Sequence, residues 1–246
     1  NSGQPSAKEV FDTTPYTILV VDDNPDMTDF LKRTFEGYFK RIIIAGDGGE
    51  ALQLVRSHVP DIIVSDVMMP RMNGYKLCKT IKENINISHI PVILLTARDD
   101  RQSQISGYKN GADGYLSKPF EVEMLMELIR NRLKNREYTK KRYLNAGLIP
   151  TPEESTISLT DETFLIKLNS IIQENIENSN LGIQFICQEV GLGRSSLYNK
   201  LKALTGMGAN EYISKLRIEK AITLISGTDM PFSEIAEKTG FTTPSY

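Results

Sequence analysis

The chain has 246 residues, a length that suggests one or two domains. Hydrophobic residues make up 40% and charged residues 24%, as in ordinary globular proteins, and the net charge of −2 argues neither for nor against nucleic acid. No apolar run reaches the roughly 18 residues of a membrane span, so we expect no membrane contact. Cys78 and Cys187 lack zinc or disulfide spacing, which favours reduced thiols in the cytoplasm.

Short apolar runs alternate with segments of helical periodicity through the first 140 residues. Each run is too short for a helix and is typical of a strand buried on both faces of a parallel sheet. This alternation predicts a doubly wound α/β fold with five parallel strands. We expect strands at 17–21, 42–45, 62–66, 92–95 and 113–116, and helices from Pro25, at 48–57, after Gly74, at 99–110 and from 121 to about 140.

Polar side chains follow four of these strands at the point where each strand ends. Asp22 and Asp23 follow the first strand, and Asp66 closes the third. Thr96 follows the fourth strand, and Lys118 follows the fifth. Because the carboxyl ends of parallel strands meet at one edge of a sheet, we expect three carboxylates, one hydroxyl and one ammonium group to gather there.

This set of groups suits the transfer of a phosphoryl group. Three clustered carboxylates repel one another and raise their own pKa values unless a cation is present. Oxygen ligands with open positions suit magnesium. A carboxylate beside such a cation, a lysine and a hydroxyl is suited to accept phosphate, because the positive groups neutralise the oxygens being transferred. An isolated Asp66 would more often cap a loop, but the combination favours an acceptor.

The same residues carry a resemblance to a known family. They match it in type, order and spacing, and they are the pair Asp22-Asp23, Asp66, the run Met68-Met-Pro-Arg-Met-Asn-Gly74, Thr96 and the pair Lys118-Pro119. Residues 16 to about 134 resemble the receiver domain of two-component response regulators. The resemblance implies the flavodoxin-like strand order 2-1-3-4-5, with the site where the order reverses.

The resemblance also implies roles for individual residues. A histidine kinase phosphorylates Asp66, Lys118 pairs with the phosphate, and Thr96 donates a hydrogen bond to it. Tyr115 occupies the aromatic switch position of the family. The magnesium ligands that it implies are Asp22, Asp23, Asp66 and the backbone carbonyl of Met68.

From Thr160 the sequence becomes helical throughout. We expect Thr160 or Asp161 to cap the first helix of this region. The segment 182–191 reads as a short helix ended by a glycine, and after a Gly-Leu-Gly turn a further helix begins at Arg194. Two helices joined by a tight glycine turn form the helix-turn-helix arrangement.

The helix from Arg194 has one apolar face and one polar face. Leu197, Leu201 and Leu204 repeat at helical spacing and are predicted to point inward. The other face carries cationic, amide, hydroxyl and aromatic groups that suit a DNA major groove. The predicted DNA contacts are Arg194, Ser195, Tyr198, Asn199 and Lys202. Six cations against two acids between Arg194 and Lys220 give a local net charge of +4, which favours phosphate contact.

A second resemblance covers this part of the chain. The resemblance rests on the segments 197–206, 211–221 and 235–241. Residues 160 to 246 resemble the AraC-type DNA-binding domain, in which one long helix joins two helix-turn-helix units, so double-stranded DNA is the implied partner. The family's second recognition helix starts near Thr243 and runs well past Tyr246, so we expect a truncated second unit and a longer natural protein.

Together these observations predict a phosphorylation-controlled DNA-binding transcription regulator that forms a homodimer on phosphorylation. The expected organisation is a flexible tail at 1–15, a receiver domain at 16–140, a linker at 141–160 and a DNA-binding domain at 161–246. The first alternative is the C-terminal output part of a hybrid histidine kinase. The others are a magnesium-dependent phosphatase with Asp66 as its nucleophile, and a receiver that only binds other proteins.

Overall fold

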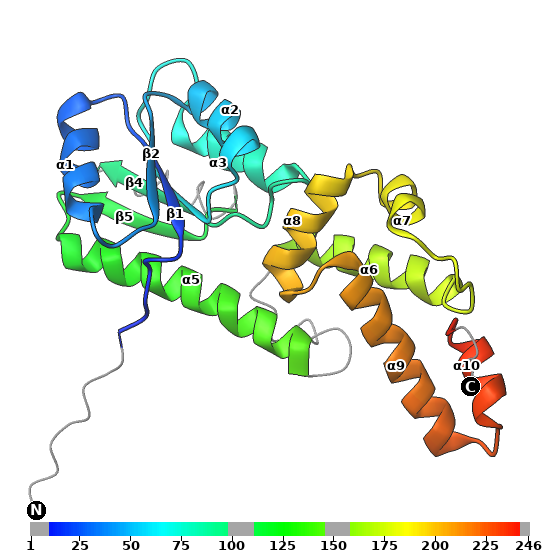
Figure 1. The fold of residues 1–246 in the computed structure, drawn as a ribbon. Coiled ribbons are helices and arrows are strands. Elements are labelled where there is room, and N and C mark those ends of the chain that lie inside the picture. The colour runs from blue at the N-terminus through cyan, green and yellow to red at the C-terminus, as the bar shows by residue number, and fades with distance from the viewer. Residues whose placement is uncertain (1–9, 98–110, 146–157, 242–246) are drawn as a thin grey trace, which may run out of the picture. The chain divides into compact units, whose positions relative to one another are not determined.

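A computed structural model of the chain describes residues 10–97, 111–145 and 158–241 (Figure 1). The predicted helix at 99–110 lies outside these residues. The chain divides into two compact units. Unit 1 comprises residues 1–83 and 90–135, and unit 2 comprises residues 84–89 and 136–246. Among the described residues, no helix combines the length and apolar character that a membrane crossing requires.

Unit 1 is built on a parallel sheet of five strands in the order β2-β1-β3-β4-β5, which confirms the predicted topology. Strand β1 lies between β2 and β3, and its Ile18 is opposite Ile42 on one side and Ile62 on the other. The strands are β1 (Thr17–Val21), β2 (Arg41–Ala45), β3 (Ile62–Asp66), β4 (Val92–Ala97) and β5 (Gly114–Lys118).

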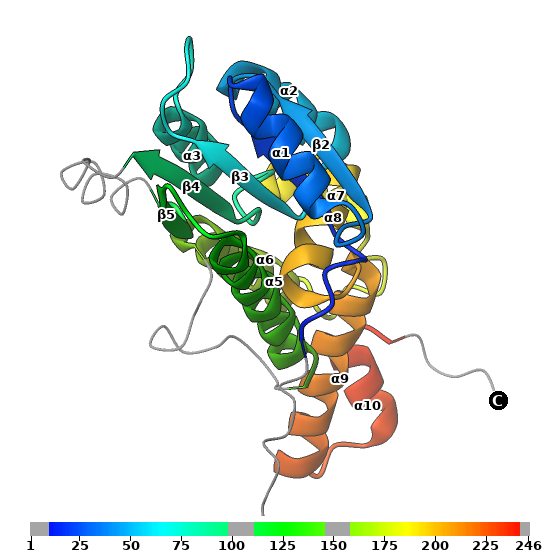
Figure 2. The ribbon, with the colours of Figure 1, turned by 90° about the vertical axis from the view of Figure 1, so that its left-hand side faces the viewer.

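Helices cover both faces of this sheet (Figures 1 and 2). One core joins β-strand residues such as Ile18 and Val64 to Phe35 of α1 and Ile129 of α5. The helices α2 and α3 contact each other on the opposite face. The helices are α1 (Pro25–Phe35), α2 (Gly48–His58), α3 (Gly74–Glu83) and α5 (Val122–Asn145).

The loops after β1 and β2 start their helices with side-chain caps. Asn24 accepts a hydrogen bond from the N–H of Asp26, and Pro25 occupies the first turn, where it costs no backbone hydrogen bond. Asp47 accepts hydrogen bonds from the N–H groups of Gly49 and Glu50 at the start of α2. These caps fix where each loop leaves the sheet edge that carries the acidic residues.

Helix α5 continues to Asn145, beyond the predicted end near residue 140. Its last ten residues, from Arg136, belong to unit 2, where Tyr143 is buried in the hydrophobic core. The backbone carbonyls of Tyr143 and Leu144 accept hydrogen bonds from Lys215. The start of the segment predicted as a linker is therefore regular helix, because its apolar residues have a core to pack against.

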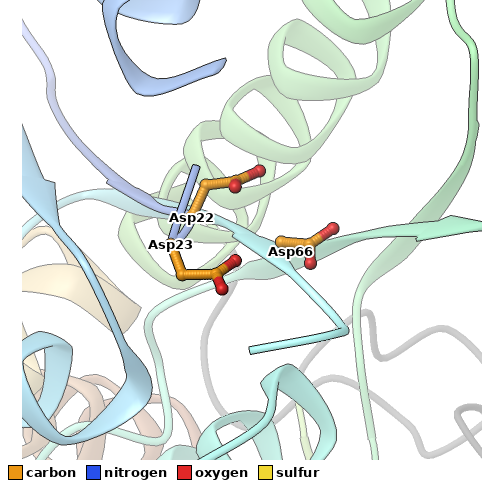
Figure 3. Close-up of side chains that lie close together, drawn as sticks. All are labelled: Asp22, Asp23 and Asp66. Carbon is orange, nitrogen blue, oxygen red and sulfur yellow. The ribbon is translucent and has the colours of Figure 1, made fainter. Parts of the chain in front are cut away.

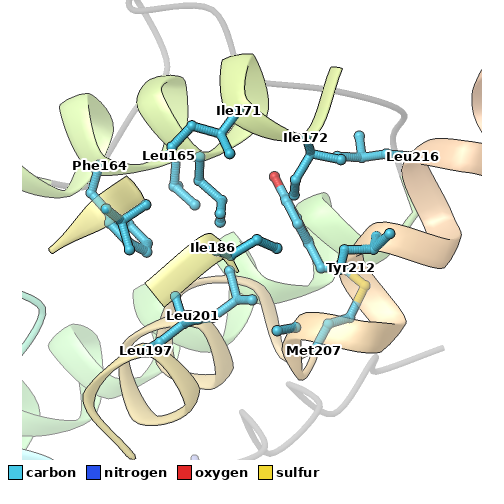
Figure 4. Close-up of a cluster of buried hydrophobic side chains, with 14 of the residues drawn as sticks. Phe164, Leu165, Ile171, Ile172, Ile186, Leu197, Leu201, Met207, Tyr212 and Leu216 are labelled. Carbon is cyan, nitrogen blue, oxygen red and sulfur yellow. The ribbon is translucent and has the colours of Figure 1, made fainter. Parts of the chain in front are cut away.

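Unit 2 is built of helices packed around an apolar core (Figure 4). Phe164 and Leu165 of α6, Ile186 of α7, Leu201 of α8 and Tyr212 of α9 meet in this core. The helices are α6 (Leu159–Glu174), α7 (Ile183–Val190), α8 (Arg194–Thr205), α9 (Ala209–Gly227) and α10 (Phe232–Lys238).

Helix α6 begins two or three residues earlier than predicted. Its N-cap is Ser158, whose hydroxyl accepts a hydrogen bond from the N–H of Asp161, so the prediction of Thr160 or Asp161 as the cap was wrong. Serine is as good a cap as aspartate. The carboxylate of Asp161 is thereby left for another contact and is buried.

Two glycines make the turns of unit 2 possible. Gly191 ends α7 with φ 73°, in the left-handed region, and its N–H donates to the carbonyl of Cys187, which turns the chain sharply into α8. Gly240 has φ 70°, and a Cβ there would lie 2.2 Å from the carbonyl oxygen of Ile176. Only glycine fits that close approach.

Candidate functional site

The three predicted acidic residues lie together at the carboxyl edge of the sheet (Figure 3). Asp22 and Asp23 follow β1, and Asp66 ends the adjacent strand β3. One carboxylate oxygen from each residue lies within 4.8 Å of the other two. Asp22 and Asp66 are buried, whereas Asp23 is exposed, so the cluster is closed on one side and open on the other.

Lys118 joins this cluster from the end of β5. Its Nζ lies 2.6 Å from Oδ1 of Asp66 and 2.9 Å from Oδ2 of Asp22. The peptide bond to Pro119 is cis. A lysine that was predicted from the sequence to sit at the same edge therefore bridges two of the three carboxylates.

Burial and charge act on Asp66 and Lys118 in different ways. Burial raises the pKa of Asp66, and the Asp22 charge adds to this, while Lys118 and the N–H of Met68 oppose it without cancelling it. For Lys118, burial alone would lower the pKa, but its hydrogen bonds and charge contacts with Asp66 and Asp22 outweigh burial and raise it. One lysine therefore leaves the buried carboxylates short of positive charge.

This donor set fits a hard divalent cation. Its ligand atoms are carboxylate oxygens, with no nitrogen or sulfur among them, which suits Mg²⁺ better than a transition metal. The surplus of negative charge over the Lys118 ammonium gives a cation a favourable place to bind. The backbone N–H of Met68 donates to Oδ2 of Asp66 at 2.8 Å, which orients this carboxylate. The Met68 carbonyl as a further ligand stays a prediction.

The loop after Asp66 is held close to the end of β3. The N–H of Gly74 donates to the carbonyl of Val67 at 3.0 Å, and a Cβ at Gly74 would lie 2.3 Å from the Asp66 carbonyl oxygen. Arg71, in the left-handed region at φ 64°, forms an ion pair with Asp47 at the start of α2. Nothing in the local sequence pattern of either residue points to this ion pair.

The two predicted switch residues lie on neighbouring strands. Thr96 of β4 is 1% exposed, and its Oγ1 has no hydrogen-bond partner among the described residues. Tyr115 of β5 is half-buried and lies opposite Leu94. The surface that they were predicted to control includes the segment 99–110, which lies outside the described residues.

Helix α8 carries the predicted DNA contacts on one face, with Leu197, Leu201 and Leu204 buried on the other as predicted. Its first helical residue is Arg194, directly after the glycine turn. Asn199 is half-buried, and the four exposed members of the set are Arg194, Ser195, Tyr198 and Lys202. The polar face is therefore accessible along the first two and a half turns of the helix.

The charge argument for this face needs a correction. Lys200, counted among the six cations, is completely buried and forms an ion pair with Asp161. Lys220 lies 3.3 Å from Glu177, and Arg217 donates to the carbonyl of Asn178 at 2.6 Å. The outward positive charge is smaller than the local count of +4 suggested. Helical spacing could have revealed this, because Lys200 lies three residues after the inward Leu197.

Comparisons with known proteins match both parts of the chain. A family described as "Response regulator receiver domain" matches residues 18–130, and one described as "Helix-turn-helix domain" matches residues 186–246. The protein named Histidine kinase P4 of Formosa agariphila is 40% identical over 230 residues, which cover 94% of this chain and 17% of that protein.

Two relatives named as response regulators match a smaller part of the chain. Response regulator MprA of a Mycobacterium strain is 36% identical over 165 residues, covering 62% of this chain and 70% of that protein. DNA-binding response regulator MtrA of Mycolicibacterium smegmatis is 35% identical over 136 residues, covering 55% of this chain and 58% of MtrA. The chain thus spans about a sixth of the kinase and over half of MtrA. It belongs to the two-component response regulators and joins their receiver domain to an AraC-type helix-turn-helix domain.

Proposed function

We propose that this protein is a DNA-binding transcription regulator that is switched by phosphorylation of Asp66 by a histidine kinase. The observation that carries the proposal is the cluster of Asp22, Asp23 and Asp66 with Lys118 at 2.6 Å from the Asp66 carboxylate. A nucleophilic carboxylate, a fixed ammonium group and two further oxygen ligands are the groups that phosphoryl transfer to aspartate requires.

In this proposal each residue has a separate task. The Asp66 carboxylate attacks the phosphorus atom of the donor, and an acyl phosphate forms as the bond to the donor breaks. Lys118 stays beside the acceptor and neutralises charge on the transferred group. Mg²⁺, held by Asp22, Asp23, Asp66 and the Met68 carbonyl, would supply further positive charge to the phosphoryl oxygens.

The switch is proposed to follow from the hydroxyl of Thr96. It is buried without a hydrogen-bond partner among the described residues, and such a donor gains by moving toward a new phosphate oxygen. Tyr115 would then turn into the space that Thr96 leaves. A local change of charge would thus alter a surface that pairs two receivers. Pairing would hold two DNA-binding domains together and raise the effective concentration at a second half-site.

DNA contact is proposed for the exposed polar face of α8. Asn199, with its amide, is the candidate for reading a base edge, and Lys202 is the candidate for contacting phosphate. Replacing Asn199 by alanine should therefore relax sequence preference. Replacing Lys202 by alanine should weaken binding to all sequences alike and flatten the salt dependence.

One experiment tests the phosphorylation and the DNA response together. The protein is treated with acetyl phosphate and MgCl₂, its intact mass is measured, and its affinity for a duplex selected from a random pool is determined. We expect one added phosphate and tighter DNA binding, and neither in Asp66→Asn. Asp26→Asn, an exposed acid in α1, is the matched control and should behave like the wild type. Labelling that persists in Asp66→Asn would refute the acceptor assignment.

A second candidate function is the output part of a hybrid histidine kinase. The supporting observation is that the 40% identity to the Formosa agariphila kinase extends through both units of this chain. In that case the phosphate donor would be part of the same polypeptide. Sequencing of the gene and its transcript separates the two candidates, because a separate regulator needs its own start codon shortly before the receiver.

A further inference from the structure

A buried charged cluster lies beneath the proposed DNA-reading helix. The Nζ of Lys200 forms an ion pair with Asp161, in the first turn of α6, and donates to the hydroxyl of Ser88 at 2.8 Å. That hydroxyl in turn donates to Oδ1 of Asp161 at 2.7 Å. Ser88 belongs to the segment 84–89, which is part of unit 2. The ring of Phe164 lies 5.1 Å from the ammonium nitrogen, a cation–π distance.

The cluster is closed to solvent and its charges are matched. The side chains of Lys200 and Asp161 are 0% and 3% exposed. The ammonium group contacts a carboxylate, a hydroxyl and an aromatic ring face, so its N–H donors are satisfied. Removing ions from water is costly, and such a pair often stabilises a fold no better than apolar residues of the same size. Stability alone is therefore a weak reason for placing it here.

The directional character of the pair gives a better reason. The inward leucines of α8, Leu197, Leu201 and Leu204, make apolar contacts, which tolerate a small rotation of the helix. The hydrogen bonds of Lys200 do not, because donor and acceptor must keep both distance and angle. The ion pair therefore sets the rotation of α8 about its own axis.

That rotation decides which residues face outward. Successive residues of an α-helix are turned by about 100° around the axis. Asn199 then points about 100° away from Lys200, and Tyr198 and Lys202 point about 160° away. A rotation of the helix by a fraction of this angle would move all of them relative to a base pair.

We propose that Lys200 is a positioning residue for DNA recognition: its buried pair with Asp161 fixes the rotation of α8 and so determines sequence specificity. This inference rests on the proposed function of α8 in DNA binding. Lys200 itself touches no DNA in this arrangement, although its place in a basic stretch of the sequence suggests that it would.

The decisive variant removes the pair but keeps the volume. The double variant Lys200→Met/Asp161→Leu removes both charges at once. Neither charge is left buried without its partner, so the chain is expected to fold. We expect the ratio of affinities for a duplex selected by the wild-type protein and a random duplex of equal length to fall about tenfold, the size of one lost base contact. Affinity for the random duplex and its salt dependence should stay unchanged.

Lys202→Met is the matched control. It removes an exposed lysine two residues along the same helix, with a side chain 48% exposed. We expect it to weaken binding to both duplexes and to flatten the salt dependence, with the ratio preserved. A folded double variant that keeps the wild-type ratio would overturn the proposal.

A DNA-free measurement separates this proposal from the proposed function. In amide NMR spectra of the whole chain, the double variant should show shifted or doubled signals for Ser195, Tyr198 and Asn199, while signals from α9 stay in place. Unchanged α8 signals would refute the positioning role even where DNA binding is intact. If the wild type prefers no DNA sequence while the double variant shows the shifts, the proposed function fails and the positioning of α8 stands.

Discussion

Lys118 and Lys200 each form ion pairs with aspartate, and their two clusters differ in how completely the charges are balanced. At the sheet edge of unit 1, Lys118 contacts the two buried carboxylates of a cluster of three, and its own side chain is 27% exposed. In unit 2, Lys200 faces one carboxylate and is completely buried. The first cluster has an unmet need for positive charge, whereas the second has none.

The pKa directions of the two aspartates express this difference. Burial raises the pKa of Asp66, and Lys118 does not fully offset it. Burial acts in the same direction on Asp161, but the charge and hydrogen bond of Lys200, with hydrogen bonds from Ser88 and Ser158, outweigh it and lower the pKa. An incomplete cluster is suited to binding and chemistry, and a complete one is suited to holding structure.

Breaking the closed cluster from one side should have the largest effect. Asp161→Asn leaves the Lys200 ammonium buried without a counter-charge, which we expect to lower the free energy of unfolding of unit 2 by about 3–5 kcal/mol. Urea unfolding followed by hydrogen exchange measures this unit separately. Glu177→Gln, which removes a surface partner of Lys220, is the control and should cost at most about 1 kcal/mol. Equal losses in both variants would contradict the burial argument.

Acid should remove the same contribution in the wild type. The folded-state pKa of Asp161 lies below its ordinary value of 3.8, so its stabilising effect is fully present above pH 3.8 and is lost as pH falls through the folded value. The stability difference between wild type and Asp161→Asn should therefore shrink below pH 3.8. Nearby Glu162 and Tyr143 are present in both proteins, so they cancel in the comparison. A difference that stays constant down to pH 2 would argue against an ionised Asp161.

The open cluster should respond to the loss of one ligand by binding metal less well. Asp23→Asn removes an exposed carboxylate oxygen from the set of three, and we expect the Mg²⁺ dissociation constant to rise about tenfold, or about 1.4 kcal/mol. Titration of Mg²⁺ monitored by the amide signals of Asp66 and Met68 measures it. An unchanged affinity would place the metal elsewhere.

Neutralising Asp66 should have the smallest effect on stability, and one of opposite sign. Because the surroundings raise the pKa of Asp66, its charge is unfavourable in the metal-free fold, and Asp66→Asn should stabilise unit 1 by about 0.5–2 kcal/mol. Added Mg²⁺ should reduce this advantage, since the ion binds the folded wild type more tightly. Thermal unfolding with and without Mg²⁺ provides the measurement. A destabilised variant without metal would mean that Lys118 balances the cluster after all.

The sequence alone led to the receiver fold and to its acidic edge. Apolar runs too short for helices predicted all five strands, and four of these runs were followed by a polar residue whose chemistry indicated the site. The strand order came from the resemblance and is confirmed. Local patterns suffice here because a buried strand is recognised from its own residues, and parallel strands bring their ends to one edge whatever the details of packing.

Only the tertiary structure revealed the second cluster. Lys200 had been counted with the outward cations of a DNA-binding helix, and Thr160 or Asp161 was expected to cap α6. Ser158 is the cap instead, and Lys200 and Asp161 pair in the interior. Asp161 and Ser88, the two partners of Lys200, lie 39 and 112 positions from it in the sequence. No periodicity links such residues, because the environment of a charged group depends on which other elements pack against it.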